Sequence, residues 1–168
     1  MQNNKSNASN DLLAAECQKA CSACCKKGKI FIPAAEHAAI KRWLAKNSPG
    51  DLKEFSMRSD ERGSFFLYDQ KDRCQFLDAS ELCRLHREGI KPRECFWWPL
   101  HAYVGDSQTV EIRVSTSCCP AYLQINDASP CLDSVEADIR TLGFDIVHEF
   151  RQIYPGSYSG VLLRTVLP

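Results

Sequence analysis

The sequence has no excess charge of either sign and no long apolar run. Its 168 residues include 21 Lys and Arg against 21 Asp and Glu, so the formal net charge is zero. Because nucleic-acid binding depends on a positive field, we expect no nucleic-acid partner. No apolar stretch approaches the roughly 18–20 residues that cross a membrane. The first residues also lack the pattern of a secretory signal. These absences predict a cytoplasmic protein that is not in a membrane.

Cysteine, in contrast, is abundant. The chain has ten cysteines, at positions 17, 21, 24, 25, 74, 83, 95, 118, 119 and 131. Disulfides rarely persist in the cytosol, where such a pattern more often indicates metal binding or catalysis. Cys131 stands apart from the others and is expected to be a small buried apolar residue.

Hydrophobic periodicity predicts an α+β fold: one small domain of helices and short antiparallel strands organised around cysteine-ligated metal. Residues 1–10 are expected to be a disordered tail, and residues 11–168 the metal-binding domain. Helices are predicted at residues 11–27, 34–47 and 130–154, the last of them long and amphipathic. Strands are predicted at residues 29–33, 64–69, 73–77 and 160–168, with a strand or turn at 81–86 and a hairpin at 100–116.

Four of the cysteines lie within nine positions, in the stretch "CQKACSACC". On an intact helix Cys17, Cys21, Cys24 and Cys25 fall in an arc of roughly 100°, with Cys17 and Cys25 about 12 Å apart along the axis. Tetrahedral zinc needs sulfurs roughly 3.8 Å apart. An intact helix therefore cannot place all four on one zinc ion. They would serve two adjacent sites, or the helix must break, and distant ligands must complete the coordination in either case.

Distant thiols are available for this role. Cys74, Cys83, Cys95 and the adjacent pair Cys118–Cys119 bring the candidates to at least eight, which suffices for two four-coordinate sites or for one cluster plus one ion. Soft thiolates suit both zinc and iron–sulfur clusters, and the spacing does not choose between them. Redox-active disulfides and simple burial in the core remain open as alternatives.

The stretch "CQKACSACC" resembles the opening of the YkgJ-like cysteine-cluster family, a zinc- or iron-chelating domain with the motif CxxCxxCC. The resemblance continues through "CQFLDASELCRLHREGIKPRECFWWPL" and covers about residues 17–120. It implies a small metal-binding fold, with Cys74, Cys83 and Cys95 at family cysteines and Cys118 or Cys119 as the last. Lys91 and Phe96 stand where the family usually has arginine.

Two histidines and an aromatic stretch are further candidates. His86 follows Cys83 with metal-ligand spacing, but a solvent-facing histidine is the favoured interpretation. His101 follows "CFWWPL", whose aromatic side chains could form core or shield a cluster from water. Arg73, Arg84, Arg87 and Arg93 supply positive charge near the thiols, which would favour thiolates.

The sequence thus predicts an iron–sulfur cluster carrier or redox component that acts with a protein partner. The predicted cofactor ligands are Cys17, Cys21, Cys24, Cys25, Cys74, Cys83, Cys95 and Cys119, with Cys118 as an alternative metal ligand. The competing hypothesis is a structural zinc domain that mediates protein interaction. No catalytic constellation is evident. The resemblance extends to the flagellin lysine N-methylase, which implies at most an accessory role in redox chemistry or methyl transfer.

Overall fold

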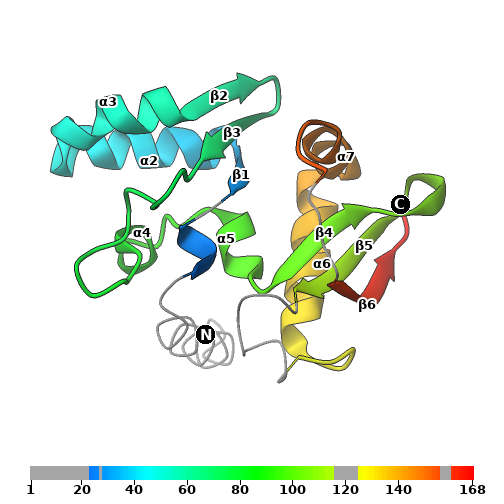
Figure 1. Ribbon diagram of the computed structural model, residues 1–168. Helices are drawn as coiled ribbons and strands as arrows, with labels where there is room; N and C mark the ends of the chain where they lie inside the picture. The colour runs from blue at the N-terminus through cyan, green and yellow to red at the C-terminus, as the bar shows by residue number, and fades with distance from the viewer. Residues whose placement is uncertain (1–22, 27, 116–124, 156–159) are drawn as a thin grey trace, which may run out of the picture. The chain divides into compact units, whose positions relative to one another are not determined.

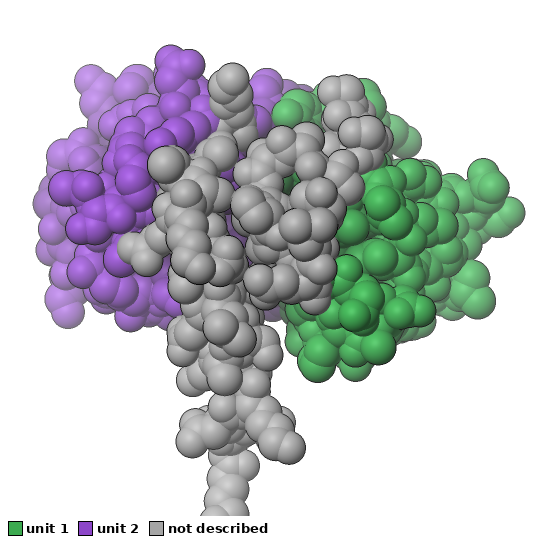
Figure 2. All heavy atoms as spheres, turned by 60° about the horizontal axis from the view of Figure 1, so that its bottom comes forward, with its two compact units in different colours: residues 1–23, 97–168 green, residues 24–96 purple. Residues whose placement is uncertain are grey.

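The computed structural model describes residues 23–26, 28–115, 125–155 and 160–168. The chain divides into two compact units (Figure 2). Unit 2 comprises residues 24–96, and unit 1 comprises residues 97–168 together with residues 1–23. The region predicted as one domain therefore contains two compact units, each with helices and an antiparallel sheet. No helix in the described ranges has the length and apolar character needed to cross a membrane.

Unit 2 is built on a small antiparallel sheet with the strand order β1-β3-β2 (Figure 1). The elements are η1 (Ala23–Cys25), β1 (Lys29–Pro33), α2 (Ala34–Asn47), α3 (Pro49–Arg58), β2 (Ser59–Arg62), β3 (Phe65–Asp69), α4 (Arg84–Arg87) and α5 (Arg93–Trp97). The predictions of strands at 29–33 and 64–69 and of a helix at 34–47 are confirmed. Their patterns are local, since apolar residues alternate in the strands and recur every three to four positions in the helix.

Helix α3 and strand β2 were not predicted from the sequence. "NSPGD" signals the end of a helix, but Pro49 also begins the next one. Proline is favoured in a first helical turn, where its missing N–H has no partner to lose. The two helices α2 and α3 lie side by side and cover the sheet (Figure 1). The buried core of unit 2 draws on the two helices, the sheet, the loop after β3 and α4, and comprises Ile32, Ile40, Leu44, Phe55, Tyr68, Cys74, Phe76 and Leu85.

The strand predicted at residues 73–77 is wrong. The only pairing there is an isolated bridge between Leu77 and Cys83. The reason is the turn that follows, in which the Asp78 carboxylate accepts hydrogen bonds from the backbone N–H groups of Ser80 and Leu82 at 2.8 and 3.1 Å. Such a side-chain turn replaces the ladder that a hairpin would need. Within the stretch predicted as strand or turn at 81–86, helix α4 begins at Arg84.

Unit 1 has a second antiparallel sheet, with the order β4-β5-β6. Its elements are β4 (Leu100–Val104), η2 (Asp106–Gln108), β5 (Val110–Ser115), α6 (Pro130–Leu142), α7 (Phe144–Ile153) and β6 (Gly160–Val166). The predicted hairpin and final strand are confirmed. The single helix predicted at 130–154 is wrong, because Gly143 adopts φ 89° and ψ 145° and separates α6 from α7.

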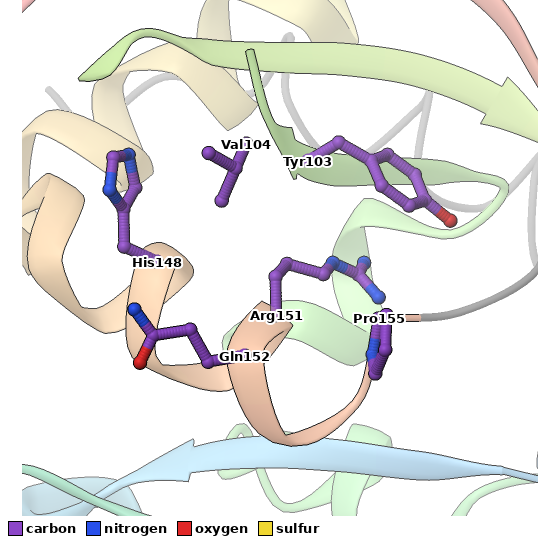
Figure 3. A pocket seen from close by; sticks show the side chains of 6 residues that line it. All are labelled: Tyr103, Val104, His148, Arg151, Gln152 and Pro155. Carbon is purple, nitrogen blue, oxygen red and sulfur yellow. The ribbon is translucent and has the colours of Figure 1, made fainter. Parts of the chain in front are cut away.

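Helix α7 is joined to strand β4 by Arg151, which Figure 3 shows reaching from the helix toward Tyr103. Its Nε donates to the carbonyl of Ala102 at 2.8 Å, and its guanidinium lies 4.2 Å from the centre of the Tyr103 ring. Arg151 is buried, and it borders a hollow of about 330 Å³ that His148 also lines. Because the contacts of Arg151 tie two elements together, its role is structural. None of the described residues that line this hollow is a cysteine.

Candidate metal centre

Five of the predicted ligands lie in the described part of the chain, and all five belong to unit 2. They are Cys24, Cys25, Cys74, Cys83 and Cys95. The other predicted ligands, Cys17, Cys21, Cys118 and Cys119, lie outside the described residues. The proposed shared helical face therefore stays a prediction, and the centre is described from the five cysteines of unit 2.

Cys24 and Cys25 lie on η1, a single 3-10 turn. Their sulfur atoms are 3.8 Å apart. Two thiolates on one tetrahedral zinc ion are separated by roughly the same distance, about 3.8 Å. The adjacent cysteines thus present their sulfurs at a separation that metal coordination uses.

Cys74 is brought to this turn by the backbone. Its N–H donates to the carbonyl oxygen of Cys25 at 2.7 Å, although the two residues are 49 positions apart. Lys26 strengthens the connection through an ion pair with Glu81 at 3.1 Å. Glu81 also pairs with Arg73. The segment after η1 and the loop between Cys74 and Cys83 are therefore held together by one hydrogen bond and a chain of charges.

Cys83 lies at the N-terminal end of α4, directly after the turn made by Asp78. Its carbonyl accepts a hydrogen bond from the N–H of His86 at 3.1 Å. Backbone hydrogen bonds from His86 and Leu85 also act on the thiol and lower its pKa, against the larger effect of burial, which raises it. In the Cys-x-x-His sequence that resembles half a metal site, His86 thus contributes its backbone N–H, as does Leu85, to the Cys83 sulfur.

Cys95 lies on α5, and two carboxylates fix this short helix to β1 and α2. Glu94 accepts a hydrogen bond from the N–H of Phe31 at 2.7 Å. Glu36 accepts one from the N–H of Arg93 at 2.9 Å and pairs with its side chain. Arg93 and Glu94, the two residues before Cys95, therefore anchor α5 to β1 and α2 and fix the position of Cys95 in unit 2.

Four of these cysteines are coupled electrostatically, since the charge of one raises the pKa of another. The pKa of Cys74 is raised from 9.0 to about 12, chiefly by burial, with smaller contributions from the charges of Cys25 and Cys83. Burial likewise raises the pKa of Cys95 well above its ordinary value, with added repulsion from Cys25, Cys83 and Cys74. We refer to Cys25, Cys74, Cys83 and Cys95 as the four-thiol cluster.

A positive charge lies beside the four-thiol cluster. Lys91 lowers the pKa values of Cys83 and Cys95, in both cases against the larger opposing effect of burial. The Lys91 ammonium also lies 4.9 Å from the centre of the Phe96 ring. The two positions that depart from the family pattern are therefore in contact with each other.

The donor chemistry of the four-thiol cluster fits a soft metal. Raised pKa values mean that the thiols are protonated at neutral pH, and a metal that binds thiolates must displace those protons. Cys74, Cys83 and Cys95 carry free thiols. Among the described residues, however, no three His, Cys, Asp or Glu side chains are arranged to hold a single metal ion. The four thiols are candidate donors, and a bound metal would have to impose their final geometry.

The histidines do not join this set. His86 lies on α4, and its ring is 5.6 Å from that of Phe96. His101 is in unit 1, where burial and the charge of Arg151 lower its pKa to about 3. His37, which its place on a predicted helix led us to expect as an ordinary partly exposed residue, is instead buried in α2 and stacks on Phe55 and Phe66.

Tyr68 is the neighbour of the cluster that sequence reasoning missed. Its hydroxyl oxygen lies 4.0 Å from the sulfur of Cys74. Burial raises the pKa of Tyr68 well above its usual range, and the neighbouring Cys74 adds to the shift. Tyr68 belongs to an alternating strand pattern that predicts core residues, and nothing in that pattern indicates a role for its hydroxyl.

Comparison with known proteins gives one match. A family model for the CxxCxxCC motif, described as a zinc- or iron-chelating domain, matches residues 16–120, which is more than half of the chain. No curated protein and no solved structure matches. The matched range contains every cysteine except Cys131.

Proposed function

Because the chain belongs to the CxxCxxCC family of zinc- or iron-chelating domains, we propose that it is an iron–sulfur protein that carries electrons for a protein partner. The proposal rests on the four-thiol cluster: the N–H of Cys74 bonds to the carbonyl of Cys25 at 2.7 Å, and burial with the neighbouring Cys25, Cys83 and Cys74 raises the pKa of Cys95. As thiolates these groups would repel one another in an apolar setting, so their ionisation is unfavourable without a metal.

Cys25, Cys74, Cys83 and Cys95 would hold the cluster, and an iron–sulfur cluster so bound supplies one-electron transfer. The remaining predicted ligands, Cys17, Cys21, Cys24 and Cys118 or Cys119, stay predictions from the sequence.

The surroundings of the four-thiol cluster suit this role. Cys25 and Cys83 pack against the core of unit 2, together with Trp43, Leu77 and Ile90. An apolar shell excludes water and influences the potential of a bound cluster. Lys91 offsets part of the negative charge of the thiolates. Exposed Leu82 and Phe96 each adjoin a cysteine of the cluster and would offer apolar contact to a partner.

A structural zinc site is the second candidate, and the Cys24–Cys25 separation favours it. A sulfur–sulfur distance of 3.8 Å is the spacing of two thiolates on one tetrahedral ion. Four-cysteine sets are also typical of structural zinc. In that case the metal would stabilise unit 2 and the protein would act by binding a partner, without electron transfer.

Free thiols at Cys74, Cys83 and Cys95 support a reducing compartment, and we propose the cytoplasm on this ground. An accessory role in methyl transfer rests on the family resemblance alone. Without a base placed beside a thiol, the described residues offer no support for a cysteine nucleophile.

The first test is metal and sulfide analysis, with an absorption spectrum, of protein purified without oxygen. Iron and sulfide with a broad visible absorbance that bleaches on reduction would support the cluster. Stoichiometric zinc without visible absorbance would replace the proposal by the structural alternative. Neither metal, after anaerobic reconstitution, would overturn both.

Single substitutions then identify the ligands. We expect Cys25→Ser, Cys74→Ser, Cys83→Ser and Cys95→Ser each to lose stoichiometric metal, because a serine hydroxyl is a poor ligand for a soft metal. Cys131→Ser is the matched control, since this thiol is free and lies on α6 of unit 1. Full metal content in all four variants would show that the four-thiol cluster is not the site.

A further inference from the structure

The hydroxyl of Tyr68 lies between two acceptors. Its oxygen is 4.0 Å from the sulfur of Cys74 and 3.4 Å from Oε1 of Gln75. The Gln75 amide is itself held in place, because its Nε2 donates to the carbonyl of Asp51 at 3.1 Å. This bond leaves Oε1 directed to Tyr68. The phenol has one hydrogen to donate, so the two acceptors compete for it.

The outcome of that competition depends on the state of Cys74. A protonated thiol is a weak acceptor, and the amide oxygen of Gln75 is then the better partner. A metal-bound sulfur carries thiolate charge, and hydrogen bonds to charged acceptors are roughly twice as strong as neutral ones. Tyr68 is 1% exposed, so its hydroxyl is removed from bulk solvent.

We propose that Tyr68 is a positioning residue of the metal centre, whose hydroxyl donates a hydrogen bond to the Cys74 sulfur when that sulfur binds metal. Gln75 holds the same hydroxyl when the site is empty of metal. The inference rests on the proposed function only in requiring that Cys74 is a ligand. It applies to zinc and to an iron–sulfur cluster alike, since a hydrogen bond to the sulfur affects its donation to either.

Packing alone does not require the hydroxyl. The Tyr68 ring lies 5.5 Å from the ring of Phe55 and 6.1 Å from that of Phe76, and both contacts involve the ring face or edge. Phenylalanine would keep both. Cys74 and Gln75 are adjacent in sequence, and the Tyr68 hydroxyl therefore has both acceptors within reach.

The experiment compares Tyr68→Phe with the wild-type full chain, reduced and loaded with cobalt(II). We expect metal affinity, measured by competition with a chelator, to fall about 10- to 100-fold, as for other second-sphere donors. The thiolate-to-cobalt charge-transfer band should move to lower energy, because an unbonded sulfur donates more readily. A purely structural role would leave that band unchanged.

Gln75→Met is the second variant, since it removes the competing acceptor and leaves the tyrosine. Its affinity should equal or exceed that of the wild type, with no shift to lower energy. Tyr154→Phe, in unit 1, is the control for loss of a tyrosine hydroxyl. If Tyr68→Phe fails to fold, an affinity loss of tenfold or more in Gln75→Met would overturn the inference by itself.

Cys74→Ser separates this inference from the proposed function. If Cys74→Ser weakens cobalt binding while Tyr68→Phe matches the wild type in affinity and spectrum, only the role of Tyr68 is wrong. If Cys74→Ser binds cobalt as tightly as the wild type, Cys74 is not a ligand and the proposed site fails as well.

Discussion

At the scale of single residues, the centre depends on contacts that neutralise or hide charge. Cys74 is buried, whereas Cys83 and Cys95 are partly buried. Lys91 is a cation that acts on both Cys83 and Cys95. Glu94 and Glu36 act on the backbone instead. Their carboxylates accept hydrogen bonds from the N–H groups of Phe31 and Arg93 and so fix α5. Lys91 therefore affects the charge state of two cysteines, and the two glutamates affect the position of Cys95.

His37 provides a residue-scale prediction for pH. Burial, with a smaller effect of Lys41, lowers its pKa from 6.5 to about 4. The folded protein therefore favours neutral His37, and this stabilisation is fully present above pH 6.5. It is lost as pH falls from 6.5 toward 4, since protonation then competes with burial.

The measurement is the free energy of unfolding across that pH range for wild type and His37→Phe. The variant keeps a ring between Phe55 and Phe66, and we expect its stability to fall less steeply with acid. Carboxylates such as Glu81, whose pKa is lowered chiefly by Arg73, titrate in both proteins and cancel in the comparison. Parallel pH curves would show that His37 does not contribute.

At the scale of elements, turns decide where the regular structure stops. The Asp78 turn replaces a predicted strand by an irregular loop, and so places Cys83 at the beginning of α4. Gly143 has a comparable effect in unit 1, where it converts one predicted helix into two. In both cases one residue overrides a pattern that extends over many.

Gly143→Ala tests this point. Its φ of 89° with ψ of 145° is a conformation that side chains rarely adopt, although a Cβ would meet no atom within 4 Å. Strain alone should lower the free energy of unfolding by about 1–3 kcal/mol. Thermal or urea unfolding measures the loss.

Gly50→Ala is the matched control, because Gly50 lies inside α3 and its added Cβ also meets no atom within 4 Å. Alanine there should be neutral or stabilise by about 0.5–1 kcal/mol, as expected for a helix. Equal effects at the two positions would contradict the assignment of strain to Gly143.

At the scale of the whole molecule, the chain has two compact units with separate cores. The core of unit 2 includes Cys74 and packs against Cys25 and Cys83. The apolar stripe of α6 and the strands β4 and β5 form the core of unit 1, which includes Leu132, Ile139 and Ile112. A metal on the four-thiol cluster would therefore stabilise unit 2 directly.

Metal removal should consequently act on one unit. After a strong chelator removes the metal, we expect faster amide hydrogen exchange at Cys74, Leu77 and Arg84, whose N–H groups bond within the cysteine loops. Amides of β5, such as those of Ile112 and Val114, should keep their protection, because they are bonded in the sheet of unit 1. Equal deprotection of both units would show that the metal supports the whole chain rather than unit 2.

The sequence by itself determined the family, through cysteine spacing, and the elements whose patterns are local: β1, α2, β3 and the β4–β5 hairpin. Periodicity suffices there, because neighbouring residues set which face is buried. Only the tertiary structure decided that Cys74 bonds to the backbone of Cys25 and that Tyr68 faces Cys74. Such contacts depend on hydrogen bonds between segments far apart in the chain, such as Cys74 to Cys25 and Phe31 to Glu94. No local sequence pattern encodes them.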